Sequence, residues 1–153
     1  MSTTTTPAPA TNTAKPDFTP PPPSPEHLAT KQVADRLVAL VREGKSYQAI
    51  QELYADNARH LEPFSMPGCP GVNEGKQRLL QMCEHWEKTT TVHSATCGDP
   101  IVNGNQFICP MSLDATSTEG PMANKRMQMS ETALYTVKDG KITEARFFYG
   151  CGM

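Results

Sequence analysis

Two hydrophobic periodicities divide this chain, and the change from one to the other limits the folds that it can adopt. In residues 26–87, apolar side chains recur three and four positions apart, as on amphipathic helices. From Thr89 onward, apolar and polar side chains alternate, as on strands with one buried face. Turn residues at Asn103-Gly104 and Lys138-Asp139-Gly140 predict hairpins between these strands. Helices followed by a hairpin-linked antiparallel sheet indicate an α+β domain.

The first 25 residues differ in composition from the rest of the chain. They hold eight of the 14 prolines, and the other 128 residues hold six. We therefore expect residues 1–25 to be a disordered Thr/Pro/Ala-rich tail, with Pro20–Pro23 in polyproline II, and residues 26–153 to form one domain. The tail is either a flexible leader or a docking motif for a proline-recognition domain. Composition carries little specificity and favours the leader.

The charge of the chain is nearly balanced, with 14 Lys and Arg, 16 Asp and Glu, and a net charge of −2. Such a balance offers no basic surface for nucleic acid or an anionic membrane. No apolar run approaches the roughly 18 residues of a membrane span, and the N-terminus lacks the basic and apolar regions of a secretory signal. We expect a cytoplasmic protein with no nucleic-acid or membrane partner.

The five cysteines are odd in number and far apart, and none forms a C-x-x-C pair. This spacing favours free thiols over a disulfide framework or a zinc site. His85 and His93 have no partner at a ligand spacing, so no metal site is predicted.

Three helices are predicted before the sheet. The first begins at Ser24-Pro25-Glu26, which combines a capping Ser, a Pro at the first helical position and an acid in the first turn, and it stops at Gly44. The second begins at Lys45-Ser46 and ends at Asp56-Asn57. Asn73 caps the third. The apolar stripe of the third helix is formed by Leu79, Met82, Cys83 and Trp86.

Five strands are expected. A short strand over residues 58–63 ends at Pro63 and leads into a turn-rich loop over residues 64–71. The four later strands are Thr90–Gly98, Gln106–Ala115, Met127–Val137 and Ile142–Tyr149.

Four short motifs occur in a fixed order along the chain. They are Leu53-Tyr54-Ala55-Asp56-Asn57-Ala58, the strand end Glu62-Pro63, Gly75 at the third helix, and Tyr135-x-Val-x-Asp139-Gly140-Lys141-Ile142. Together they resemble the SnoaL-like (polyketide cyclase-like) branch of the nuclear transport factor 2-like superfamily, over roughly residues 28–150.

The resemblance implies a cystatin-like, SnoaL-like α+β barrel: a cone in which a strongly curved antiparallel sheet wraps around about three N-terminal helices. An apolar pocket for a hydrophobic small molecule is implied between helices and sheet, and so is a homodimer formed through the outer sheet face. The superfamily includes ketosteroid isomerase, polyketide cyclases, limonene epoxide hydrolase, dehydratases and members without chemistry. No cofactor is expected, and the fold does not fix the function.

Glu62 is the first candidate catalytic residue. On an extended segment, Ala58, His60 and Glu62 share one face. The resemblance implies that Glu62 occupies the position of the general base of ketosteroid isomerase, where the isomerase has Asp. Burial in an apolar pocket raises the pKa of a carboxyl toward values useful for proton transfer. The alternative is a solvated acid that caps a turn.

Glu131 is the second candidate. The odd-numbered residues of its strand are mostly apolar and are expected to face the core, which makes Glu131 a lone acid among buried side chains. Such an acid is protonated, paired or hydrogen-bonded, because an unpaired buried carboxylate is costly. The alternatives are a bulge that turns Glu131 outward or a structural ion pair with Arg146.

Further candidates surround these two acids. His60 is the third candidate catalytic residue: it could exchange a proton with substrate or orient Glu62, or be an ordinary strand histidine. Tyr54 and Tyr135 could donate hydrogen bonds to a substrate oxygen or belong to the core. The expected pocket wall, or plain core, consists of Trp86, Met82, Phe107, Met129 and Phe148.

The two oxyanion donors of ketosteroid isomerase are missing. Their positions fall on Leu37 or Val38 and near Ala133, and the Asp-Arg-Asp set of the epoxide hydrolase has no clear equivalent. Two hypotheses therefore stay open. One is a cofactor-free isomerase, cyclase or lyase that uses Glu62, assisted by Glu131 or His60. The other is a non-catalytic ligand-binding or dimeric interaction module.

Overall fold

The computed structural model describes residues 17–150, so most of the predicted tail lies outside the described residues. Residues 17–24 are exposed and belong to no helix or strand. Helix α1, Pro25–Arg42, begins where the sequence predicts, because the Ser24 side chain accepts a hydrogen bond of 3.1 Å from the backbone N–H of His27. Gly44 follows the helix with a φ of 73°, a left-handed conformation that favours glycine.

Helix α2, Ser46–Leu53, is shorter than predicted, because strand β1 occupies Tyr54–Leu61. The prediction that residues 54–57 are helical is wrong. Tyr54 pairs with Ile142, far along the chain, and this tertiary pairing overrides the local helical pattern.

Strand β2, Val72–Glu74, was not predicted, and it precedes helix α3, Lys76–Thr89. The residue that caps α3 is Gly75, not Asn73 as predicted. Asn73 is buried in β2 instead, where its amide donates to the carbonyl oxygen of Pro70 and accepts from the Nε of Arg78. The side chain of Asn73 therefore stabilises the turn before α3 and does not cap the first backbone N–H groups of that helix.

The later strands follow the predicted alternation, with ends that agree to within two residues where a strand was predicted. They are β3 Thr90–Cys97, β4 Ile101–Asn103, β5 Gln106–Ser117, β6 Arg126–Lys138 and β7 Lys141–Phe148. The strand order in the sheet is β2-β1-β7-β6-β5-β3, and β4 pairs with β5. The α+β fold with a curved sheet around helices is confirmed.

Two details of the sheet differ from the expectation. Strands β1 and β7 are parallel, so the sheet is mixed rather than wholly antiparallel. Strands β2 and β3 remain as edges, so the sheet does not close into a barrel. The parallel pairing joins elements at opposite ends of the domain, which local hairpin signals do not reveal.

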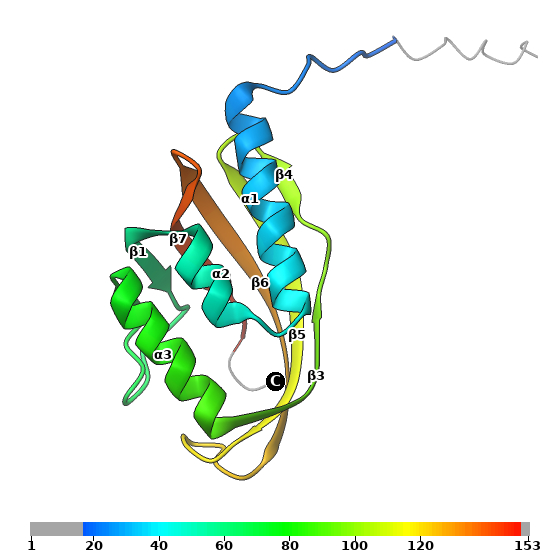
Figure 1. Ribbon diagram of the computed structural model, residues 1–153. Coiled ribbons are helices and arrows are strands. Elements are labelled where there is room, and N and C mark those ends of the chain that lie inside the picture. The colour runs from blue at the N-terminus through cyan, green and yellow to red at the C-terminus, as the bar shows by residue number, and fades with distance from the viewer. Residues whose placement is uncertain (1–16, 151–153) are drawn as a thin grey trace, which may run out of the picture.

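The three helices lie against one face of the curved sheet (Figure 1). Helix α1 packs against α2 and the strands β3, β4 and β5, whereas α3 packs against α2 and β1. The core between helices and sheet includes Leu37 and Leu40 of α1, Leu79 of α3, Phe107 of β5 and Ile142 of β7. None of the helices in the described part of the chain is long and apolar enough to cross a membrane.

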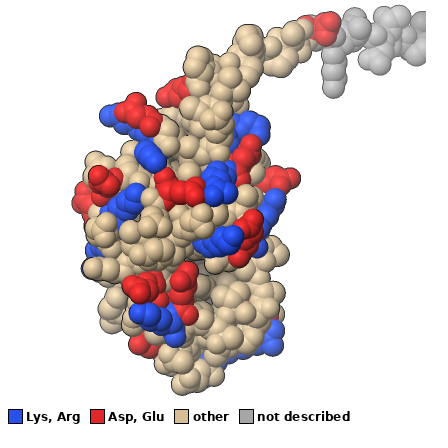
Figure 2. Space-filling model, in the orientation of Figure 1, with Lys and Arg blue, Asp and Glu red and all other residues tan. Residues whose placement is uncertain are grey.

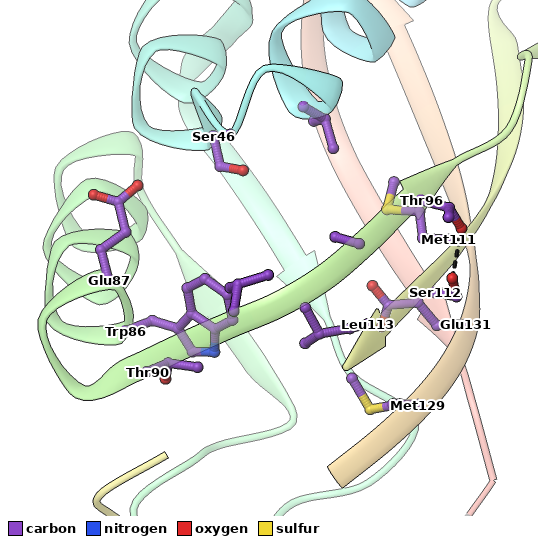
Figure 3. Close-up of a pocket in the computed structure, with 14 residues that line it drawn as sticks. Ser46, Trp86, Glu87, Thr90, Thr96, Met111, Ser112, Leu113, Met129 and Glu131 are labelled. Atoms are coloured by element: carbon purple, nitrogen blue, oxygen red, sulfur yellow. Dashed lines mark hydrogen bonds between the residues drawn. The ribbon is translucent and has the colours of Figure 1, made fainter. Parts of the chain in front are cut away.

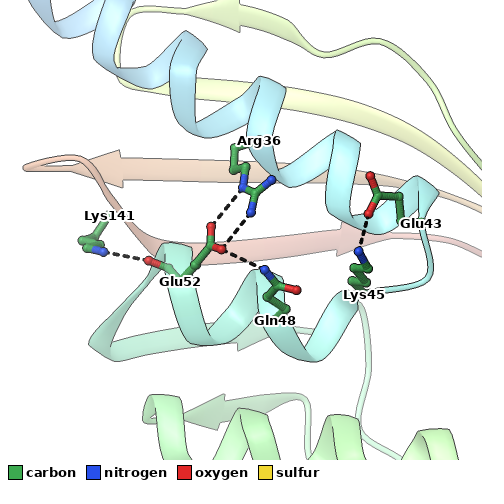
Figure 4. Close-up of polar contacts among 6 residues, drawn as sticks. All are labelled: Arg36, Glu43, Lys45, Gln48, Glu52 and Lys141. Atoms are coloured by element: carbon green, nitrogen blue, oxygen red, sulfur yellow. Dashed lines mark hydrogen bonds and ion pairs between the residues drawn. The ribbon is translucent and has the colours of Figure 1, made fainter.

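A polar network joins α2 to its neighbours (Figure 4). Arg36 of α1 donates hydrogen bonds of 3.0 and 2.8 Å to the two carboxylate oxygens of Glu52, and Gln48 donates a third of 2.9 Å. Lys141 of β7 donates to the backbone carbonyl oxygen of Glu52 at 2.7 Å. These contacts fix the end of α2, from which β1 leaves for the interior.

Two isoleucines that differ in burial should differ strongly in how much they contribute to the free energy of unfolding. We expect Ile142→Ala, at a fully buried position, to lower the free energy of unfolding by about 2–5 kcal/mol. The matched control is Ile101→Ala on β4, where the side chain is 64% exposed, and its expected loss is below about 0.5 kcal/mol. Urea unfolding measures both, and equal losses would contradict the described core.

Candidate functional site

Glu62 lies just beyond the end of β1, on the same side as the helices. The backbone there is fixed by a hydrogen bond of 2.7 Å from the N–H of Glu62 to the carbonyl oxygen of Gly71. The carboxylate accepts a hydrogen bond of 2.7 Å from the hydroxyl of Tyr149, and the ring of Tyr149 contacts that of Phe64 edge to face. These contacts limit the orientations of the Glu62 carboxylate.

Glu131 lies on the inner face of β6, among the odd-numbered residues expected to face the core. Burial, together with a smaller contribution from the negative charge of Glu62, raises the pKa of its carboxyl from 4.5 to about 7. The structural ion pair with Arg146 does not form, because Arg146 lies nearest to Glu144, at 3.8 Å. Glu131 therefore holds its proton up to near-neutral pH.

His60 and Tyr54 form a hydrogen-bonded pair on the inner face of β1. The Tyr54 hydroxyl lies 3.0 Å from Nε2 of His60, and the His60 ring packs edge to face against Phe147. Burial lowers the pKa of His60 from 6.5 to about 4, so its imidazole is neutral at pH 7. The pair therefore offers neutral hydrogen-bonding groups rather than a positive charge.

These side chains line a cavity of about 380 Å³, here called the inner chamber. Its wall includes Tyr54, His60, Glu62, Met82, Glu131 and Tyr135. Buried side chains of α1, α2 and α3 complete the wall, among them Leu37, Ile50 and Leu79. The volume falls within the range of about 300–1,000 Å³ of small-molecule sites.

A second cavity of about 490 Å³, the outer chamber, adjoins the first (Figure 3). Its wall includes Trp86, Val92, Ala95, Leu113, Met129 and Glu131. None of its lining residues is fully buried, which distinguishes it from the inner chamber.

The structure brings most of the predicted site residues to these chambers. Tyr54, Tyr135 and Met82 line the inner chamber, Met129 lines the outer chamber, and Trp86 lines both. Two residues lie elsewhere. Phe107 is buried in the core, where its ring stacks on that of Tyr135 at 4.7 Å, and Phe148 is 51% exposed beside a groove that Ser130 and Thr132 also line. Phe107 and Phe148 therefore line neither chamber.

Tyr149 and Met111 also belong to the site, although neither was predicted from the sequence. Tyr149 alternates with Ala145 and Phe147, so the inward-facing pattern of β7 could have found it. Met111 lies opposite Glu131 in the pairing of β5 with β6, and it lines both chambers. The long connection between these two strands hides their register in the sequence.

At the positions of the missing isomerase donors the structure has apolar side chains. Leu37 lines the inner chamber, and Val38 and Ala133 are buried. The hydrogen-bond donors of this site must therefore come from other residues, and protonated Glu131 is one of them.

The family model for the SnoaL-like domain matches residues 28–149. A crystal structure of a candidate SnoaL-like polyketide cyclase [carbohydrate phosphatase] from Mesorhizobium loti is 34% identical, with a TM-score of 0.71, over 77% of this chain and 97% of that chain. Among curated proteins there is no significant match.

More distant solved structures share the fold. A candidate isomerase from Bacillus subtilis is 17% identical, with a TM-score of 0.64, over 83% of this chain and 90% of that chain. An LEH-like epoxide hydrolase from M. tuberculosis is 14% identical, with a TM-score of 0.61, over 82% of this chain and 86% of that chain.

The raised pKa of Glu131 predicts an unusual dependence of stability on pH. Since folding raises this pKa from 4.5 to about 7, the folded state binds the proton more tightly, and stability falls as pH rises through that window. Glu131→Gln removes this loss. We expect the variant to gain about 1–3 kcal/mol relative to the parent protein between about pH 5 and pH 8.

Urea unfolding of both proteins at the two pH values measures this gain. His60 acts in the opposite direction, because its lowered pKa makes stability rise with pH between about 4 and 6.5, but it is present in both proteins and cancels. The control is Glu74→Gln, at an exposed position on β2. A difference for Glu131→Gln that does not change with pH would contradict the burial of this carboxyl.

Proposed function

The chain belongs to the SnoaL-like domain family, and we propose that it catalyses cofactor-independent proton transfer, as in an isomerase, cyclase or lyase, on a small apolar carbonyl compound. The observation that carries the proposal is the presence of two carboxyl groups, Glu62 and Glu131, in one largely apolar cavity. Burial and the nearby charge of Glu62 raise the pKa of Glu131 to about 7, in the range useful for a general acid near neutral pH.

In the proposed reaction, the Glu62 carboxylate removes a proton from the carbon next to the substrate carbonyl. Negative charge then develops on the carbonyl oxygen, and the protonated carboxyl of Glu131 donates a hydrogen bond or its proton to that oxygen. Return of the proton from Glu62 to another carbon, with any proton on the oxygen going back to the Glu131 carboxylate, restores the carbonyl and both acids and completes an isomerisation without net oxidation. Tyr149 positions Glu62 through its hydrogen bond of 2.7 Å.

The Tyr54–His60 pair is a second source of hydrogen bonds to the substrate oxygen. Both residues line the inner chamber, and the neutral imidazole donates through one ring nitrogen without adding a charge. A neutral donor suits an enol-like transition state, because its own charge needs no compensation in an apolar cavity. This pair would take the place of the two hydrogen-bond donors of ketosteroid isomerase, whose positions are apolar in this chain.

The second candidate function is ligand binding without catalysis. The apolar side chains at Leu37, Val38 and Ala133 favour it, because an oxyanion then depends on Glu131 and the Tyr54–His60 pair alone. The two candidates differ in whether Glu62 moves a proton.

Deuterium exchange tests the proposal without knowledge of the natural substrate. Neutral cyclic ketones and β-diketones are incubated with the protein in D₂O, and loss of the α-proton signal is followed by NMR. We expect exchange above the buffer rate, and a loss of about 10²–10⁴-fold in Glu62→Gln. Glu74→Gln is the matched control, since Glu74 is exposed on β2. If Glu62→Gln exchanges at the parental rate, Glu62 is not the base.

The same assay predicts the effect of pH. Because Glu131 must hold its proton and its pKa is about 7, we expect the exchange rate to fall as pH rises above about 7. In Glu131→Gln the rate is lower, and this decline disappears. A decline that persists in Glu131→Gln would assign it to another group.

We also propose that two copies of the chain associate through the outer face of the sheet. A groove there is lined by Pro110, Ser112, Ser130, Glu131, Thr132 and Phe148, and the large apolar ring of Phe148 is 51% exposed, where a second copy would cover it. Light scattering should give twice the 16.7 kDa of one chain. Phe148→Glu should give the single-chain mass, and a parent protein of single-chain mass would contradict the dimer.

A further inference from the structure

The outer chamber lies where the helices leave the inner face of the sheet uncovered. It is bounded by the turn between α1 and α2, by the end of α3, and by β3, β5 and β6. In Figure 3, Trp86 extends from α3 across β3, and Leu113, Met129 and Glu131 approach from the neighbouring strands. The strands thus continue the wall of the inner chamber beyond the helices.

The two chambers form one continuous site, because five residues line both of them. They are Val41, Ser46, Trp86, Met111 and Glu131. Glu131 therefore lies at the junction of the two chambers. Glu62 lies on the inner side of this junction, and Trp86 and Val92 extend the site on the outer side. A molecule whose reacting carbonyl contacts Glu131 can extend into the outer chamber.

The outer chamber has the chemistry of a site for an apolar ring. Trp86 is 42% exposed although it is large and apolar, and Val92 is 44% exposed. Leu113, Met111 and Met129 surround the space between them. A planar ring packed on the Trp86 indole would remove this apolar surface from water.

The charges at the site are of one sign. The outer chamber is lined by Glu87 and Glu131, and the inner chamber by Glu62 and Glu131, whereas no Lys or Arg among residues 17–150 lines either chamber. In Figure 2, charged side chains gather mainly over the helices, and much of the lower part of this face is uncharged. A carboxylate or phosphate on the ligand would meet acidic groups without a compensating cation.

We propose that the outer chamber is a second subsite that binds a neutral, ring-bearing part of the ligand against Trp86, and that the site as a whole rejects anionic ligands. The inference rests on the proposed function only in placing the reacting carbonyl at Glu131. It assigns Trp86 and the inner face of β3 a role in specificity rather than in proton transfer.

Two probes of similar size, one neutral and one negatively charged, test the inference. One is 2-acetonaphthone, a neutral aromatic ketone, and the other is 2-naphthoate, its carboxylate counterpart. Calorimetry at about pH 6, where Glu131 holds its proton and the carboxylate probe is ionised, gives each dissociation constant. Fluorescence then locates the binding, because Trp86 is the single tryptophan of the chain. We expect the ketone to bind and quench Trp86, and the carboxylate to bind at least about tenfold more weakly.

A matched pair of variants on β3 tests the subsite itself. Ala95→Phe fills the outer chamber from an exposed position, whereas Ser94→Phe adds the same ring at a neighbouring exposed position that lines neither chamber. We expect Ala95→Phe to weaken binding of 2-acetonaphthone about tenfold or more, and Ser94→Phe to leave it unchanged. Circular dichroism and thermal unfolding check that both variants are folded.

Binding of the carboxylate as tight as that of the ketone would overturn the charge part of the inference. Equal binding by Ala95→Phe and the parent protein, or no binding of the ketone, would overturn the subsite. These measurements are repeated in Glu62→Gln, which removes the proposed base and leaves both chambers. Retained binding there supports the subsite whatever the outcome of the exchange assay, so the two proposals fail separately.

Discussion

The desolvation of one carboxyl group, that of Glu131, is the constraint on which the rest of the site depends. Strand β6 alternates strictly, and its inner face must be apolar where it covers the helices. Glu131 belongs to that face, where it is partly exposed to the outer chamber, and the surrounding protein still disfavours its charged form. The protein keeps the group protonated to near-neutral pH, at a cost in stability that grows as the proton is lost.

The second carboxyl depends on the one parallel pairing of the sheet. Because β1 runs beside β7 in the same direction, the ends of both strands lie together, and Glu62 meets Tyr149 there. The open edge at β3 has a different consequence: the inner face of the sheet continues past the helices and leaves an accessible chamber beside Glu131. The mixed and unclosed sheet is thus the physical origin of both parts of the site.

Local patterns predicted the elements, and long-range pairing accounts for the errors. The cap at Ser24 and the alternation of β6 depend on residues close together in the sequence. The start of helix α1 and the inward orientation of Glu131 could therefore be predicted. Residues 54–57 have a helical pattern but belong to β1, where Tyr54 pairs with Ile142 of β7. Asn73 is of a residue type that caps helices but is buried in β2. Both outcomes depend on strand pairing, of β1 with β7 and of β2 with β1.

The site shows the same division. Glu62, His60 and Glu131 could be placed on inner faces by alternation, whereas the outer chamber depends on how far the helices extend over the sheet. Residue type alone did not predict the position of Phe107 correctly. Its large aromatic side chain packs on Tyr135 in the core and does not line the cavity. Side-chain character identifies candidates, and only the packing decides which of them a ligand can contact.

We expect protonated Glu131 to contact the carbonyl oxygen of a bound neutral ketone. Infrared difference spectroscopy of a ketone with ¹³C at the carbonyl measures this contact directly, since a hydrogen bond lowers the stretching frequency. At about pH 6 we expect a lower carbonyl frequency in the parent protein than in Glu131→Ala, and a rise in the parent protein as Glu131 loses its proton. A carbonyl frequency that is the same in both proteins at every pH would contradict it.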